Sequence, residues 1–303
     1  MICSLLRPFL IVSSRSILNR RRGSAMTLKK TLLVALFAAT ATLLVACGAS
    51  NKQTSSDAWD SYKQKKTITL GFDNTFVPMG YKDESGKNTG FDIELAKAVF
   101  DQYGINVKYQ AINWDLKETE LNNGKIDLIW NGYSVTKERQ AKVAFTEPYM
   151  KNEQVLVTQK SSQISSFADM KNKTLGAQSG SSGYDAFTSH PKVLKDLVKG
   201  NDATQYETFT QAFIDLKNKR IDGLLIDRVY ANYYLQQEGE LDRYNIIASE
   251  FEGEDFAVGV RKADKTLQKK ITQALKSLYQ DGTFQKISKK WFGEDVATVQ
   301  LKS

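Results

Sequence analysis

Polar residues follow several of the predicted strands, and open parallel sheets bind ligands beyond the ends of their strands. Carboxylates, hydroxyls, an arginine and aromatic side chains all occur at these places, so the chemistry available is recognition of a small charged molecule. The groups are residues 73–78, Trp114 with Asp115, residues 131–139, and the turn at 178–183 together with Asp227.

Arg139 occupies an unusual position for a cation. Thr136 is a good N-cap and would place Arg139 in the first turn of a helix, where the helix dipole disfavours positive charge. An anion bound between the guanidinium and the helix end would explain this position, because arginine binds carboxylates with two parallel hydrogen bonds. The alternative is a surface arginine paired with Glu138 or Glu147.

Two further groups complement that arginine. Ser181 and Ser182 lie in a small-residue turn before a predicted helix, where exposed amides and hydroxyls suit a carboxylate. Asp227 follows a predicted strand at 224–226 and suits an ammonium. The alternatives are a helix-capping turn for the serines and an N-cap role for Asp227.

Composition excludes several classes of site. The chain has one histidine, His190, and two cysteines, Cys3 and Cys47, which excludes multi-histidine metal sites and zinc clusters. We therefore expect no metal and no cofactor. Seven of the 42 basic residues lie within 1–46, where no acidic residue occurs, leaving 35 basic and 34 acidic residues from Cys47 onward. The folded part is nearly neutral, so a nucleic-acid partner is not expected.

The first 46 residues are typical of an export signal. Two lysines precede an uncharged stretch at 31–46 that is short for a membrane span and ends in small residues. The sequence Leu-Val-Ala-Cys at 44–47 resembles the lipobox of bacterial lipoproteins, in which the cysteine is acylated; the alternative is an ordinary signal peptide with a chance cysteine. Two acyl chains on Cys47 would anchor the protein stably, with residues 47–64 as a flexible tether. We expect translation to start at Met26, downstream of residues 1–25.

The chain is long enough for two compact domains, and from residue 67 it alternates short β-rich runs with amphipathic stretches. This alternation predicts an α/β fold. The phrase at 121–127 (LNNGKID) is repeated at 216–222 (LKNKRID), 95 residues later, which predicts two lobes of like construction.

From residue 67 to about 294 the chain resembles the polar-amino-acid solute-binding proteins of ATP-driven importers, the bacterial extracellular solute-binding protein family 3, in its lipoprotein form. Several phrases carry the resemblance, and they occur in the right order. They are GFDxTFVP at 71–78, TGFDIELAKA at 89–98, GKID at 124–127, SxTxxR at 134–139, FTEPY at 145–149, and DGTFxKI with KWFG at 281–293.

The resemblance implies a type II periplasmic-binding-protein-like fold, with two α/β lobes and the ligand in the cleft between them. Lobe 1 would comprise 65–149 and 257–295, and lobe 2 would comprise 154–251. A two-stranded hinge would lie at 149–153 and 252–256. Closure of the lobes would bury the ligand.

The resemblance also implies roles for individual residues. Arg139 would pair with the ligand α-carboxylate, and Asp227 would bind the α-ammonium, because a buried zwitterion needs both charges compensated. Asp73 would meet a donor-bearing side chain, which favours glutamine, arginine, lysine or cystine and disfavours Asp and Glu. The remaining implied contacts are Phe76 and Trp114 as aromatic walls and Ser134, the Gly132 backbone, Ser181 and Ser182 around the ligand backbone.

The implied function is an extracellular, membrane-anchored, monomeric receptor that delivers a polar L-amino acid to the permease and ATPase of an ABC importer. One alternative is an amino-acid-sensing surface receptor or an adhesin that uses the same cleft. An enzyme on the same fold is disfavoured, because it would need a positioned acid-base residue.

Overall fold

The computed structural model describes residues 57–303. The predicted signal peptide, the acylated Cys47 and the tether as far as residue 56 lie outside the described residues. Within residues 57–303, no helix combines the length and the apolar character needed to cross a bilayer.

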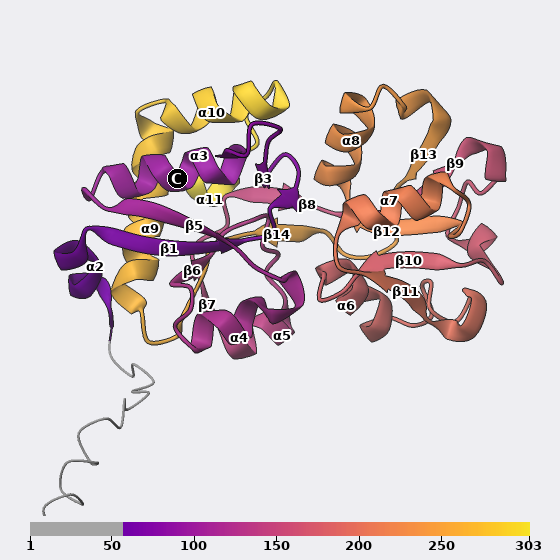
Figure 1. Ribbon diagram of the computed structural model, residues 1–303, viewed down its shortest axis with the longest axis horizontal. Coiled ribbons are helices and arrows are strands. Elements are labelled where there is room, and N and C mark those ends of the chain that lie inside the picture. Colours follow the sequence, from indigo (N-terminus) through magenta and orange to yellow (C-terminus); the bar gives the residue numbers. More distant parts are fainter. Residues whose placement is uncertain (1–56) are drawn as a thin grey trace, which may run out of the picture. The chain divides into compact units, whose positions relative to one another are not determined.

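The first lobe is built around a mixed five-stranded sheet (Figure 1). In order across the sheet, its strands are β5 (Asn106–Ala111), β1 (Thr67–Phe72), β6 (Leu128–Ile129), β15 (Gly259–Val260) and β7 (Ala144–Phe145). β1 pairs in parallel with both β5 and β6, whereas β15 is antiparallel to β6 and β7. Ile68, Leu70 and Phe72 alternate into the core from β1, which explains why this β-rich run forms a central strand.

The second lobe repeats this arrangement. Its strands, in order, are β11 (Ala203–Tyr206), β10 (Leu175–Gln178), β12 (Gly223–Asp227), β9 (Gln154–Gln159) and β13 (Tyr244–Ile247). β10 pairs in parallel with β11 and β12, and β9 is antiparallel to β12 and β13. The two sheets therefore share one strand order and one pattern of strand direction.

Helices flank both sheets, and a small three-stranded sheet adds to lobe 1. The longest apolar face belongs to α9, where Leu267, Ile271, Ala274, Leu275 and Leu278 are buried at helical spacing. The helices of lobe 1 include α3 (Phe91–Asp101), α4 (Lys117–Asn122), α5 (Lys137–Lys142), α9 (Lys265–Gln280) and α10 (Thr283–Phe292). Those of lobe 2 are α6 (Ser182–Ser189), α7 (Phe209–Lys217) and α8 (Arg228–Gln237). The small sheet comprises β2 (Thr75–Phe76), β3 (Gly80–Lys82) and β4 (Asn88–Thr89).

Two short antiparallel strands connect the lobes, β8 (Met150–Asn152) and β14 (Glu254–Phe256). They lie within the two segments predicted for the hinge. β8 leads directly into β9, and β14 leads into β15. Each hinge strand therefore continues into the fourth strand of a sheet, the one that is antiparallel to its neighbours. The expected fold, two α/β lobes on a two-stranded hinge, is confirmed.

The repeated phrase falls at equivalent turns of the two lobes, before β6 and before β12. Asp127 exchanges two hydrogen bonds with the backbone of Thr69, N–H to carboxylate at 2.9 Å and N–H to carbonyl at 2.8 Å. Asp222 makes the same pair of bonds with Thr174, both at 2.8 Å. The prediction of two like lobes is confirmed, and the repeat marks the turn that fixes the central strand of each.

The boundaries of lobe 1 differ from the prediction. Helix α2 (Trp59–Lys65) lies within the predicted tether, yet Trp59 and Tyr62 are buried against lobe 1. Asp57 accepts a hydrogen bond from the Thr266 backbone, and Ala58 donates one to Asp264. The tether prediction was therefore wrong for residues 57–64, because the two aromatic rings gain about 2 kcal/mol or more each from burial.

At the other end of the chain, the predicted limit of lobe 1 at residue 295 was too early. Helix α11 (Val299–Lys302) packs onto lobe 1 with Leu301 buried, and the Thr298 backbone donates to the Tyr149 carbonyl.

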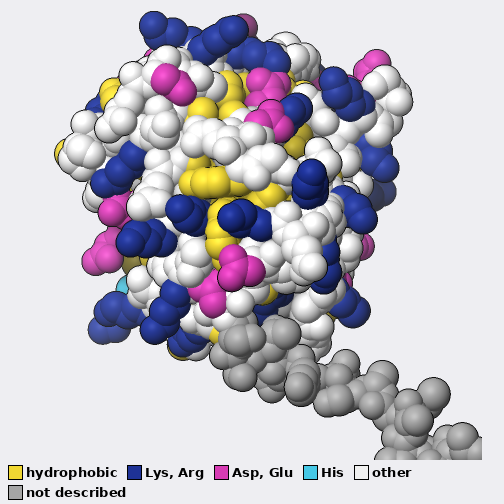
Figure 2. Space-filling model, turned by 90° about the vertical axis from the view of Figure 1, so that its left-hand side faces the viewer, with side chains coloured by type: hydrophobic (Ala, Val, Ile, Leu, Met, Phe, Trp, Pro, Cys, Tyr) yellow, Lys and Arg dark blue, Asp and Glu magenta, His cyan; other side chains and the backbone are white. Residues whose placement is uncertain are grey.

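Charged side chains of both signs are spread over the face of lobe 1 that points away from lobe 2 (Figure 2). Figure 2 shows Lys and Arg side chains interspersed with Asp and Glu around a small strip of hydrophobic side chains.

Candidate ligand-binding site

A buried aspartate shapes the turn at Gly132. Asp92, at the start of α3, accepts hydrogen bonds from the Gly132 N–H at 2.7 Å and from the Tyr149 hydroxyl at 2.9 Å. Burial raises the pKa of Asp92 to about 7. Gly132 has a φ of +56°, and a Cβ there would lie 2.8 Å from the Phe76 ring. The turn therefore requires glycine, and the Gly132 N–H is used within lobe 1.

Arg139 lies at the N-terminal turn of α5, which Thr136 caps as predicted. The side chain is 2 % exposed, and its guanidinium donates to the Ser134 carbonyl and, across the lobes, to the Gly180 carbonyl, each at 3.0 Å. Its Nε has no hydrogen-bond partner. The alternative of a surface arginine is wrong, because Glu138 pairs with Lys142 and Glu147 pairs with Lys276.

Lys117 is a second buried cation at the same place, and no sequence pattern singled it out. Its ammonium donates to the Gly180 carbonyl at 2.8 Å, beside Arg139, and lies 3.4 Å from Glu118. Burial and the neighbouring arginine lower the pKa of Lys117 to about 8. Two cations of lobe 1 thus converge on one carbonyl of lobe 2, with the carboxylates of Glu118 and Asp185 as counter-charges, and an anion bound here would be stabilised by both cations.

The two serines of the small-residue turn differ in what they contact. The Ser181 hydroxyl accepts from the Tyr184 N–H and caps α6, as the capping alternative predicted. The Ser182 hydroxyl oxygen instead lies 3.1 Å from both the Ser134 hydroxyl of lobe 1 and Glu254 of the hinge, and its one hydrogen is shared between them. Ser182 and Ser134 therefore meet across the lobes, and both are buried.

Asp227 stands at the N-cap position of α8 but does not cap the helix. Its carboxylate accepts from the Asn152 amide at 2.7 Å and from the Gln154 amide at 2.9 Å. Glu254, on hinge strand β14, accepts from the same two amides at 3.1 Å each and from the Ser134 hydroxyl at 2.7 Å. Burial, together with the charge of Glu254, raises the pKa of Asp227 to about 7.

Asp73 also reaches the other lobe. It accepts from the Thr75 hydroxyl and N–H within its own turn, and from the Gln178 amide of lobe 2 at 2.8 Å. The same amide nitrogen donates to the Glu207 carbonyl at 3.0 Å. Burial raises the pKa of Asp73. These acceptors make a subsite suited to a ligand group that carries N–H donors.

The two predicted aromatic walls lie in different surroundings. Phe76 packs against Phe209 and Tyr230 of lobe 2, with ring centroids 5.9 and 5.5 Å apart. Trp114 lies edge-on to Tyr133 of its own lobe at 5.8 Å, and the Lys117 ammonium lies 5.1 Å from its ring centre. Phe76 is thus an inter-lobe contact, whereas Trp114 packs beside the two cations.

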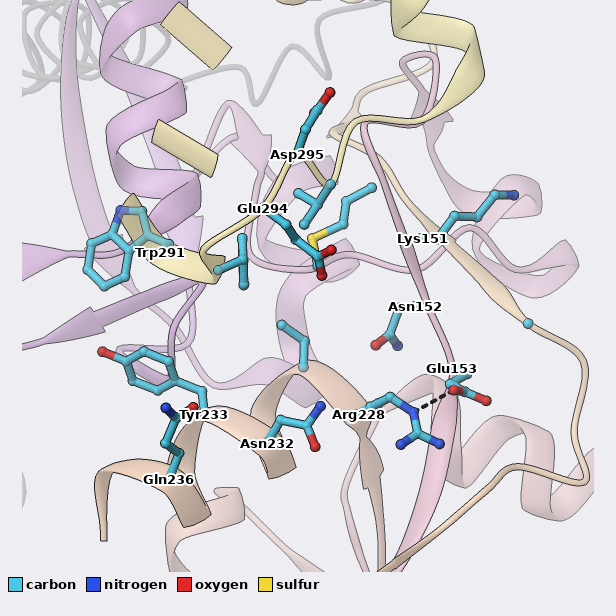
Figure 3. Close-up of a pocket in the computed structure, with 15 residues that line it drawn as sticks. Lys151, Asn152, Glu153, Arg228, Asn232, Tyr233, Gln236, Trp291, Glu294 and Asp295 are labelled. Atoms are coloured by element: carbon cyan, nitrogen blue, oxygen red, sulfur yellow. Dashed lines mark hydrogen bonds and ion pairs between the residues drawn. The ribbon is translucent and has the colours of Figure 1, made fainter. Parts of the chain in front are cut away.

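A cavity of about 690 Å³ lies at the hinge (Figure 3). It is lined by β8, one face of α8, the end of α10 and the segment that follows it, and the Arg228–Glu153 ion pair stands at its edge. None of the nine predicted binding residues lines this cavity. Asn152 belongs to both regions, since it lines the cavity and donates to Asp227 and Glu254.

The described part of the site is therefore a closed arrangement with opposite charges at its two ends. Cations of lobe 1 meet a carbonyl of lobe 2, and carboxylates of lobe 2 and the hinge meet hydroxyls and amides of both lobes. Among residues 57–303, no group of three or more His, Cys, Asp or Glu side chains is arranged to hold a metal ion. The chemistry available is recognition of a molecule with separate positive and negative groups.

Comparison with known proteins identifies the class. Residues 68–294 match the model of the bacterial extracellular solute-binding proteins, family 3, and the chain belongs to that family. The L-cystine-binding protein TcyA of Bacillus subtilis is 32 % identical over 89 % of this chain and all of its own length. The ABC transporter arginine-binding protein 1 of Escherichia coli is 32 % identical over 74 % of this chain and 90 % of its own.

A solved structure is more similar still. An ABC uptake transporter substrate-binding protein from Streptococcus pneumoniae, crystallised with bound histidine, is 63 % identical. The match covers 81 % of this chain and all of that one, with a TM-score of 0.80. The named relatives are binding proteins, not enzymes.

The residues that sequence reasoning missed are Lys117, Asn152, Gln154, Gln178 and Glu254. Gln178 had a weak signal, since it opens the predicted turn. The other four lie in a short helix or near the hinge, where no local pattern separates a buried polar side chain from an exposed one.

Proposed function

We propose that this chain is the receptor of an ABC importer and binds a polar L-amino acid between its lobes. The observation that supports this most is the separation of charge in the closed site. Arg139 and Lys117 stand at one end, and Asp227 and Glu254 at the other. An α-amino acid has a carboxylate and an ammonium at matching ends, and burial of both requires compensation of both.

The subsite for the ligand side chain narrows the range of amino acids that could bind. Asp73 and the Glu207 carbonyl both accept hydrogen bonds there, so a side chain with N–H donors fits better than a carboxylate. Histidine is the first candidate, because the 63 % identical pneumococcal protein was crystallised with it. Arginine, lysine, glutamine and cystine remain in the test set.

The experiment is a thermal-shift panel of the twenty amino acids, cystine and ornithine on the chain from Ser50. A ligand that binds only the folded state raises the melting temperature. We expect a rise with a small set that includes histidine, and a much smaller rise in an Arg139→Ala variant. No rise with any polar amino acid would contradict the proposal.

The proposal includes anchoring through acylated Cys47 on the extracellular face of the cell membrane, and action as a monomer. A Cys47→Ala variant should move from the membrane fraction to the medium, whereas a Cys3→Ala variant should stay membrane-bound. Deleting the partner permease should abolish uptake of the ligand. Unchanged uptake would favour the alternative of a sensing receptor or adhesin with the same cleft.

A further inference from the structure

Asp227 and Glu254 form an unusual pair, because two carboxylates share the same two neutral donors. Each amide nitrogen of Asn152 and Gln154 lies within 3.1 Å of both carboxylates. An amide nitrogen carries two hydrogens, so one can go to each carboxylate. The pair is thus bridged by amides without a cation bonded to either member in the described residues.

Buried acceptors outnumber donors around this pair. The Asn152 Oδ1 and Gln154 Oε1 atoms are buried and have no hydrogen-bond partner. Their orientation is set by the amide nitrogens, which face the carboxylates. Gln154 is fully buried, and its oxygen lies where a Cβ on Gly183 would come within 2.4 Å. The amide oxygens therefore point away from the carboxylates, and the two carboxylates share neutral donors, an arrangement that a bound cation or a proton would stabilise.

Glu254 also ties the site to the hinge. Its Oε2 accepts from Ser134 of lobe 1, Ser182 and Gln154 of lobe 2, and Asn152 of β8. These donors come from both lobes and the opposite hinge strand, so this set of bonds exists only when the lobes are together. The half-buried carboxylate of Glu254 is therefore enclosed by the same motion that would bury the ligand.

The other charged groups that face the pair are already engaged. Arg139 of α5 donates to two carbonyls and Arg228 of α8 pairs with Glu153, whereas Lys151 and Asp255 pair with each other on the opposite face of the hinge strands from Asn152 and Glu254. Asp185 of α6 adds negative charge near Arg139. No formal cation in the described residues neutralises the second carboxylate of the pair.

We propose that Glu254 is a second carboxylate for the ligand ammonium, and that this ammonium replaces a proton held by Asp227 beside Glu254 in the closed, ligand-free protein. Binding of the amino acid then releases a proton. The inference rests on the proposed function. The inference adds Glu254, which the sequence analysis did not name, to the binding residues. It also adds the release of a proton to the binding equilibrium.

The sign of the linkage follows from the raised pKa of Asp227, about 7. Below pH 7 the free pair holds a proton that the ammonium must displace, so the association constant should rise with pH by up to tenfold per unit toward pH 7. Above pH 7 the pair is ionised beforehand and this dependence ends. The raised pKa also predicts that the ligand-free protein loses stability as pH rises through 7.

The first arm of the test needs no ligand. Carbon-13 NMR titration of the side-chain carboxyls compares the wild type with Glu254→Gln and with Glu153→Gln, a hinge carboxylate that pairs with Arg228 outside the site. Two carboxyls, those of Asp92 and Asp227, should titrate near pH 7 in the wild type and in Glu153→Gln. In Glu254→Gln the titration of Asp227 should move to lower pH, whereas that of Asp92, which is bound to Gly132 and Tyr149, should stay in place. A wild type in which Asp92 alone titrates near pH 7, or an unchanged titration of both carboxyls in Glu254→Gln, overturns the inference.

The second arm is calorimetry with L-histidine at pH 6 in two buffers of different ionisation enthalpy. The histidine imidazole also titrates, so the quantity compared is the difference between variants. The wild type and Glu153→Gln should each release close to one proton at the pair, and Glu254→Gln at most half as many. Equal release with intact binding overturns the inference alone, whereas absence of binding by histidine and every other polar amino acid contradicts the proposed function itself.

Discussion

The two lobes use one strand order but bring opposite charges to the cleft. In each sheet the second strand is parallel to both of its neighbours, and the fourth strand is antiparallel to the third and to the fifth. Lobe 1 presents Arg139 and Lys117 to the Gly180 carbonyl, whereas lobe 2 presents Asp227 near the hinge carboxylate Glu254. The comparison teaches that the common frame sets where the loops meet, and that the residues of those loops decide which sign of charge each lobe presents there.

The largest expected effect comes from removing one charge from either lobe. Arg139→Ala and Asp227→Ala should each cost about 2 to 5 kcal/mol of binding free energy, because each leaves a buried partner charge uncompensated. Calorimetry on the chain from Ser50 measures this. Arg243→Ala, which removes an exposed arginine of lobe 2, is the matched control and should bind normally. Wild-type affinity in either cleft variant would place the ligand elsewhere.

The equivalent turns of the two lobes should differ in how much they stabilise the fold. Asp127 and Asp222 make the same backbone bonds, but Asp127 also accepts from Tyr62 and pairs with Arg261 at 3.2 Å. Asp127→Asn should therefore lower the free energy of unfolding by about 2 to 4 kcal/mol and Asp222→Asn by about 1 kcal/mol. Urea unfolding compares them, and equal losses would mean that the Tyr62–Arg261 contacts add no stability.

The two charged ends of the site should weaken ligand binding in different pH ranges. The carboxylate end should do so below pH 7, and Lys117 should do so above pH 8. Lys117 has a pKa lowered to about 8, so above pH 8 the free protein must take up a proton before both cations can face a carboxylate. Affinity should then fall by up to tenfold per pH unit from pH 8, about 1.4 kcal/mol. In Lys117→Met the fall should begin only near pH 9, where the ligand ammonium itself titrates. If the affinity of Lys117→Met also falls from pH 8, then Lys117 does not contribute to binding the ligand carboxylate.

The smallest effect is expected at a turn position where the lobes differ by one residue. Gly124 and Lys219 are equivalent, and both have positive φ, +72° and +58°. A Cβ on Gly124 would meet no atom within 4 Å, so Gly124→Ala measures the backbone conformation alone and should cost about 1 kcal/mol of stability. Lys219→Gly should change stability by about 0.5 kcal/mol or less, because relief of strain is offset by a more flexible unfolded chain. A loss above 1 kcal/mol in Lys219→Gly would indicate a side-chain contact there.

Local patterns predicted much of the frame. The apolar alternation of β1, the N-cap at Thr136 and the turn between α9 and α10 depend on neighbouring residues, so they could be read directly from the sequence. The repeat at 121–127 and 216–222 predicted the likeness of the lobes for the same reason. Docking of α2 could not be predicted, because its partners on α9 lie more than 200 residues away.

The candidate site divides in the same way. Arg139 and Asp227 were identifiable because each follows a strand or a cap that marks a cleft-facing loop. Lys117 and Glu254 were not, because their sequence neighbours resemble those of ordinary surface charges. Only contacts across the closed cleft, such as the Lys117 bond to Gly180 and the Glu254 bond to Ser182, make them part of the site.

The sequence by itself determined two like α/β lobes, the turns that start their central strands, and one charge of each sign in the loops between them. The tertiary structure alone decided that a second cation joins Arg139 and a second carboxylate joins Asp227. The physical reason is that burial and charge pairing arise between segments distant in the chain, whereas secondary structure and caps arise between neighbours.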